Sequence, residues 1–236
     1  MDFIGFNELV WFGFALVDLT TVVLLFRYFG RVGLIALMVF SLVLCNIQVL
    51  KIVELFGITT TLGNILYSGI FLATDILSEC YGKKEARQAV RISFVFLILA
   101  TFYMQVALIY IPAPEDFAQP HLEAIFGLLP RVTLASLLAY GISQHFDIWA
   151  FLRIKKATEG RFLWLRNNAS TLTSQFLDSL IFCGVAFYGL YPLPVVVEIL
   201  ISTYVIKALV TVLETPFVYA GRKVYRIYIK DKEVRL

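Results

Sequence analysis

Charged residues are scarce in this chain of 236 residues. Asp, Glu, Lys and Arg together make up 16% of it, whereas ordinary soluble domains contain about 25%. Apolar residues reach 60%, against about 45–50% in soluble domains. This balance excludes a water-soluble globule and a disordered chain, and 14 Gly and 7 Pro residues are too few for a collagen-like or linker-rich chain. The composition therefore indicates an integral membrane protein.

Residues that bind metals or perform nucleophilic chemistry are also few. The two histidines, His121 and His145, are isolated in or beside opposite loops, which excludes the clustered ligands of an H-E-x-x-H metal site. The three cysteines lie in or beside apolar stretches at no metal-ligand spacing, and we interpret them as small buried apolar residues. We therefore predict a protein that is not an enzyme and needs no metal or cofactor. An intramembrane serine hydrolase with His145 as its base is the enzymatic alternative.

Long apolar runs are the dominant feature that is present. A membrane-spanning helix needs about 20 such residues, and the runs predict an all-α polytopic helical bundle in which residues 1–236 form one integral membrane domain. Asp2 and Glu8 stand where a signal peptide would carry positive charge, so we interpret the first span as retained. The predicted spans are residues 9–26, 32–53, 61–79, 91–111, 128–147, 170–190 and 197–220.

The basic residues fall on one side of this arrangement. Seventeen of the 20 Lys and Arg residues lie in the loops and the tail of that side, while the opposite loops carry Glu115, Asp116, Glu123 and Glu198 and almost no positive charge. The positive-inside rule therefore places the N-terminus outside and the C-terminus, with a basic tail at 226–236, in the cytoplasm. Orientation and contact with anionic lipid explain these basic loops, so no nucleic-acid partner is predicted.

Polar residues recur at helical spacing inside several spans, which predicts a polar, partly hydrated cavity along the bundle axis. Hydrogen bonds that hold helices together are the alternative explanation for Ser, Thr and Tyr. Asp178 and Lys207 favour a functional role, because a charge at mid-bilayer costs at least about 2.5–3.5 kcal/mol. Asp18 is alone in its span and has no predicted partner. The stripes are Tyr67, Phe71, Asp75 and Glu79; Thr133, Ser136, Tyr140, either Ser143 or Gln144, and Asp147; Thr171, Ser174, Asp178 and Phe182, with Gln175 alongside; and Thr203, Lys207, Thr211 and Glu214, with Asn46 in the second span.

The segment from Phe71 to Arg87, FLATDILSECYGKKEAR, resembles the signature of the queuosine precursor transporter family, also called the vitamin uptake transporter family. Together the matching blocks cover about residues 32–225, which corresponds to the six-helix unit of that family, and the span at 9–26 resembles an addition to it. The other blocks are Arg131 to Ser136 with Ala139 to Gln144 and Asp147, Ser170 to Asp178, and Tyr204 to Lys207 before Pro216.

The resemblance implies uptake of 7-deazaguanine bases, the precursors of the tRNA nucleoside queuosine, across a bacterial or archaeal cytoplasmic membrane. The six-helix unit is similar to the substrate-binding subunits of energy-coupling-factor vitamin transporters, which dock on an ATPase module through small residues of their first helix. The Ala-xxx-Ala pair of this chain, Ala135 and Ala139, lies in the fifth span, so no ATPase module is predicted. Another vitamin-like substrate and a scaffold role are the alternatives, and a homodimer is left open.

The chemistry of a guanine-like base supplies candidate roles within that resemblance. One carboxylate accepts hydrogen bonds from its N1–H and 2-amino group, its O6 accepts from a basic or amide side chain, and its flat ring stacks on an aromatic face. Asp178, or Asp75 with Glu79, is the candidate for the donor edge. The candidates for O6 are Lys207, Gln175, Asn46 and Gln144, those for stacking are Phe71, Tyr67 and Tyr204, and Arg131 of the second block completes the set.

Overall fold

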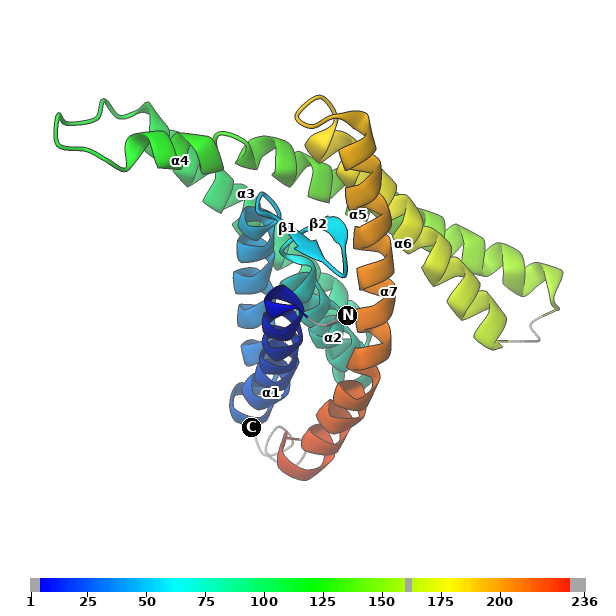
Figure 1. The fold of residues 1–236 in the computed structure, drawn as a ribbon. Helices are drawn as coiled ribbons and strands as arrows, with labels where there is room; N and C mark the ends of the chain where they lie inside the picture. Colours follow the sequence, from blue (N-terminus) through cyan, green and yellow to red (C-terminus); the bar gives the residue numbers. More distant parts are fainter. Residues whose placement is uncertain (1–4, 160–162, 230–236) are drawn as a thin grey trace.

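The structure, a computed structural model, describes residues 5–159 and 163–229 (Figure 1). Within these ranges the side chains of Gln144, Asp147, Thr171 and Thr211 lie outside the described part. The described chain is almost entirely helical, with one small sheet. The elements are α1 (Phe6–Gln48), β1 (Ile52–Leu55), β2 (Ile58–Thr61), α2 (Asn64–Tyr81), α3 (Lys83–Ile109), α4 (Gln119–Phe126), α5 (Leu129–Ala157), α6 (Leu163–Phe187), α7 (Leu193–Val224) and the π-helical turn η1 (Tyr225–Ile229).

The first two predicted spans are the two halves of α1. Gly30 interrupts the helix with φ +58° and ψ −142°, a backbone conformation that is open to glycine and costly for other residues. The chain reverses there, and a Cβ built on Gly33 would lie 2.6 Å from the Leu25 carbonyl oxygen. The two glycines thus permit the tight turn and the close approach that bring the halves together.

A β-hairpin between α1 and α2 differs from the predicted arrangement. The second span was expected to reach residue 53 and the third to begin at 61, but α1 ends at Gln48 and α2 begins at Asn64. Residues 52–61 instead form two antiparallel strands, in which Leu55 pairs with Ile58. Phe56 and Gly57 at the turn both have positive φ, 55° and 73°, as a two-residue hairpin of type I′ requires. The strands are rich in β-branched residues, which favour the extended chain.

Four helical segments of the described chain are long and apolar enough to cross a membrane: Phe6–Gln48, Lys83–Ile109, Gln119–Ser143 and Leu193–Val210. Leu172–Phe187 is a shorter apolar helix. With 43 residues and a reversal at Gly30, α1 has the length for two crossings. These features agree with an all-α polytopic membrane protein.

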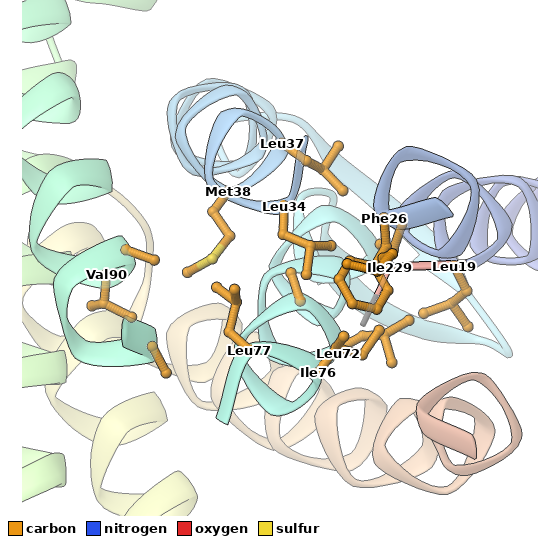
Figure 2. Packing of buried hydrophobic residues seen from close by; sticks show 14 residues of the cluster. Leu19, Phe26, Leu34, Leu37, Met38, Leu72, Ile76, Leu77, Val90 and Ile229 are labelled. Carbon is orange, nitrogen blue, oxygen red and sulfur yellow. The ribbon is translucent and has the colours of Figure 1, made fainter. Parts of the chain in front are cut away.

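The main apolar core forms around α2. Leu72, Ile76 and Leu77 of α2 pack against residues of both halves of α1, among them Phe26 and Leu34 (Figure 2). Helix α2 also contacts α3 and α7. Helices α5 and α6 pack along one another and extend past α7 at the right of Figure 1. This arrangement places one face of α2 opposite α7, and the polar residues of both helices gather there.

Candidate functional site

A buried ion pair joins α6 to α7. The Lys207 Nζ lies 2.7 Å from Asp178 Oδ2, and the two residues are only 9% and 8% exposed. The same ammonium lies 4.6 Å from the centre of the Tyr67 ring of α2, within the range of a cation–π interaction. Because a charge removed from water needs an opposite charge close by, this contact fixes three helices around one point.

Hydrogen-bonding side chains of α5 and of the second half of α1 surround the pair. Ser143 Oγ donates to the other oxygen of Asp178, Oδ1, over 3.4 Å. Ser136 Oγ donates to Asn46 Oδ1 over 2.6 Å, and the Asn46 amide donates to the Leu42 carbonyl over 2.7 Å. The polar residues of five helices therefore converge on one place, in agreement with the cavity that their helical spacing predicts.

A cavity lies between these residues. It is narrow and partly open to the surroundings, with about 40 Å³ of room for water-sized molecules, and its walls include Asn46, Tyr67, Ser136, Asp178 and Lys207. The cavity therefore brings a carboxylate, an ammonium group, an amide and an aromatic ring to one common space.

The segment from the end of β2 to the start of α2 forms part of the cavity wall. Thr61, Gly63 and Asn64 belong to its wall. Gly63 has φ +92°, and a Cβ there would lie 2.7 Å from the Cys45 carbonyl oxygen. Only glycine suits this position, because both its backbone conformation and its contact with α1 exclude a side chain.

The hairpin itself is held by two carboxylates that belong to different helices. Glu198 Oε1 of α7 accepts the Thr59 N–H over 2.8 Å, and Ser202 Oγ donates to the Thr59 carbonyl over 3.0 Å. At the turn, Glu8 Oε1 of α1 accepts the Phe56 N–H over 2.6 Å. The hairpin is thus fastened across the gap between α1 and α7.

The face of α2 that carries Tyr67 leads away from the hairpin. Tyr67 and Phe71 are partly buried and in edge-to-face contact, with 4.9 Å between ring centres. Asp75 and Glu79 further along the same face are exposed. Glu79 lies 3.3 Å from Arg222 of α7 in a half-exposed ion pair, beside a second open space of about 620 Å³. A polar track therefore runs along α2 from the cavity to the opposite end of the bundle.

The structure brings together some of the predicted site residues. Asn46, Tyr67, Asp178 and Lys207 line the cavity, and Phe71 contacts the Tyr67 ring. Asp75 and Glu79 lie further along the track of α2.

Three other predicted residues have different surroundings. Arg131 donates through Nε to the Val185 carbonyl over 2.7 Å and through its guanidinium to the Tyr188 carbonyl, so it fastens α5 to the end of α6. The Tyr204 ring packs against Phe176. Gln175 lies one turn before Asp178 on α6, outside the set of residues that line the cavity.

Two polar cavity residues were missed by sequence reasoning. Thr61 and Asn64 lie in the stretch that was assigned to the third span. The Gly63 between them is a turn signal that would have marked the break in the helix. The Gln144 side chain is outside the described part of the structure.

Taken together, the apolar helices and the polar cavity between them are features of a polytopic membrane protein of the transporter class. A family model described as "Putative vitamin uptake transporter" matches residues 61–221. A "Probable queuosine precursor transporter" of Bacillus subtilis (strain 168) is 47% identical over 219 residues, which are 92% of this chain and 96% of the relative. The chain therefore belongs to the vitamin uptake transporter family, and it is a transporter rather than an enzyme.

More distant relatives carry similar names. A "Queuosine precursor transporter" of Escherichia coli (strain K12) is 34% identical over 139 residues, 58% of this chain and 59% of the relative. A "Probable queuosine precursor transporter" of Haemophilus influenzae is 26% identical over 133 residues, 56% of this chain and 54% of the relative. No solved structure gives a significant match, so the similarity to energy-coupling-factor subunits stays a prediction from the sequence.

Proposed function

We propose that this protein imports queuosine precursors, 7-deazaguanine bases used in tRNA queuosine salvage, and binds them in the cavity around Asp178 and Lys207. The observation that carries the proposal is the buried ion pair of these two residues beside the Tyr67 ring. A buried pair made for stability alone gains little over apolar packing. Its place in the wall of a cavity that also contains amide, hydroxyl and aromatic groups supports a role in binding.

The two charges match the edge of a guanine-like base. The Asp178 carboxylate can accept from N1–H and from the 2-amino group, and the Lys207 ammonium can donate to O6. Asn46 and Ser136, which bond to each other over 2.6 Å, supply a neutral donor and acceptor next to them. The Tyr67 face offers a stacking surface for the ring. The two charges also pair with each other over 2.7 Å, so that each compensates the other inside the bundle.

The sidedness of the basic loops gives the cavity a direction. With the N-terminus outside, the hairpin and its two carboxylates lie at the outer end, and the Glu79–Arg222 pair lies at the cytoplasmic end. The hairpin then closes the cavity toward the outside. The exposed side chains of Asp75 and Glu79 on α2 then point to release of the substrate toward the cytoplasm, as expected of an inner-membrane importer.

Calorimetric and thermal titration of the detergent-purified protein tests the substrate. We expect 7-cyano- or 7-aminomethyl-7-deazaguanine, but not adenine, to raise the free energy of unfolding by about 2.7 kcal/mol at one hundred times Kd. An Asp178→Asn variant should bind neither compound, whereas Glu123→Gln on the exposed helix α4 should bind like the wild type. Folded wild-type protein that binds no deazaguanine would refute the proposal and bring another vitamin-like substrate forward.

A further inference from the structure

A second group of acidic side chains lies between the same helices as the ion pair. Asp18 of the first half of α1 is 6% exposed and Glu214 of α7 is 5% exposed. Ala15 of α1 and Val210 of α7 belong to one apolar cluster, against which Leu213 packs, so the two buried acids lie where α1 and α7 pack together. Asp75 belongs to α2, which contacts both of these helices, and repulsion of Glu214 by Asp18 and Asp75 agrees with this placement.

Asp18 occupies a space that the fold makes for it. A Cβ built on Gly69 of α2 would collide with the Asp18 carboxylate, so the absence of a side chain at Gly69 is what admits the acid. Asp18 Oδ2 is fully buried and has no hydrogen-bond partner among the residues that the structure describes. A buried acceptor without a partner is costly, and this oxygen faces α2 on the side of the acidic group.

The cations around the three acids are engaged elsewhere or lie at helix ends. The described side chains of α1, α2, α6 and α7 provide no cation bonded to Asp18 or Glu214. Like charges in a poorly solvated place cannot all stay ionised, and an uncompensated carboxylate inside a membrane binds a cation or a proton. Among the described cations, Lys207 pairs with Asp178, Arg222 with Glu79 and Arg31 with Glu85, while Arg87 and Arg91 lie in the first turns of α3.

We propose that Asp18, Asp75 and Glu214 form a proton-binding site that couples substrate import to proton entry. The inference rests on the proposed function, because the proton is coupled to movement of that substrate. One acid takes a proton from water on the outer side, holds it as a neutral carboxyl group inside the bundle, and returns it to cytoplasmic water through Asp75, which is exposed. No other bond is made or broken.

The helices that carry the substrate residues also carry the acids, which provides a physical route for coupling. Glu214 follows Lys207 by seven residues on α7, and Asp75 follows Tyr67 by eight residues on α2, so each acid lies about two turns along the same helix face. A ligand that separates Asp178 from Lys207 shifts α7 relative to α2 and changes the surroundings of Glu214. Proton affinity and substrate affinity are then linked, and each changes the other by the same factor.

Two measurements on the full-length protein test the inference. Calorimetric titration with 7-cyano-7-deazaguanine, repeated in buffers of different ionisation enthalpy, measures the number of protons taken up or released when the base binds. In liposomes, an inward proton gradient of one pH unit should accumulate the base about tenfold if one proton accompanies each molecule, and a dye inside should report acidification.

Neutral variants separate coupling from binding. Glu214→Gln and Asp18→Asn should keep the Kd for the base within about twofold of the wild type but lose proton exchange on binding. In liposomes they should equilibrate the base across the membrane without accumulating it, as a proton-independent carrier does. Asp75→Asn, an exposed position, gives the same test if the buried variants do not fold. The matched control Glu123→Gln should accumulate the base like the wild type.

The outcomes are distinguishable from those of the proposed function. Wild-type protein that binds no deazaguanine overturns the substrate and the coupling together. Wild-type protein that binds the base but exchanges no proton and ignores the pH gradient overturns the coupling alone. Accumulation driven by a sodium gradient, or undiminished accumulation by a folded Glu214→Gln variant, also overturns the proton site.

Discussion

Removal of one member of the buried ion pair should cost more stability than removal of both. Asp178→Asn leaves the Lys207 ammonium, 9% exposed, without its carboxylate. Breaking a buried pair in this way typically costs about 3–5 kcal/mol. For a chain of this size each kcal/mol lowers Tm by about 2–4 °C, so we expect a drop of about 6–20 °C. The Tyr67 ring stays beside the ammonium, which favours the lower end of that range.

The double variant Asp178→Leu with Lys207→Met tests the cause. It replaces the pair by apolar side chains of similar volume, which is commonly neutral or stabilising, so Tm should return to within a few degrees of the wild type while substrate binding stays lost. Thermal unfolding of the purified proteins, followed by intrinsic fluorescence, measures both. As a control, Arg222→Gln breaks a half-exposed pair and should cost no more than about 1 kcal/mol. Equal losses for the single and the double variant would refute the reasoning.

Three further changes probe the hairpin and the glycines. Glu198→Ala removes the acceptor of the Thr59 N–H, and such charge-assisted hydrogen bonds contribute about 1.5–3 kcal/mol. The backbone amide of Thr59 should therefore exchange its hydrogen at least tenfold faster. Unchanged exchange would show that Glu198 does not hold the hairpin. Gly69→Ala should destabilise by about 1–3 kcal/mol through its collision with Asp18, and Asp18→Ala should relieve that loss in thermal unfolding. Gly63→Ala, at φ +92°, should lower Tm and weaken substrate binding, and a normal Tm would contradict the contact with Cys45.

The polar face of α2 shows what helical spacing can predict and what it cannot. The i, i+4 spacing of Tyr67, Phe71, Asp75 and Glu79 indicates one shared face, and the structure shows that this face leads from the cavity to an exposed end. Spacing could not say what opposes that face. Asp18 had no predicted partner, because the helix that presents Glu214 to it lies almost 200 residues further along the chain.

The hairpin at residues 52–61 could not be located from apolar runs. Its strands are apolar and β-branched and directly adjoin two helical spans, and a short apolar run does not distinguish a strand from a helix end. The signals that were available were the Gly57 turn and the Gly63 break. Arg131 shows a different limit. Its place in a motif block suggested substrate, whereas in the structure it donates to two carbonyls near the end of α6.

The sequence by itself determined the membrane setting and the break near Gly30, and it predicted the sidedness of the basic loops and a role for Asp178 and Lys207. Each of these follows from composition or from the spacing of residues along one helix. Such signals do not depend on tertiary contacts, because a charged residue in lipid is costly for a helix whatever packs against it. The tertiary structure alone decided that Asp178 and Lys207 meet over 2.7 Å beside Tyr67, that the end of a hairpin forms part of their cavity wall, and that Asp18 faces Gly69. These contacts join segments far apart in the chain, and helical periodicity states which residues share a face but not which faces pack together.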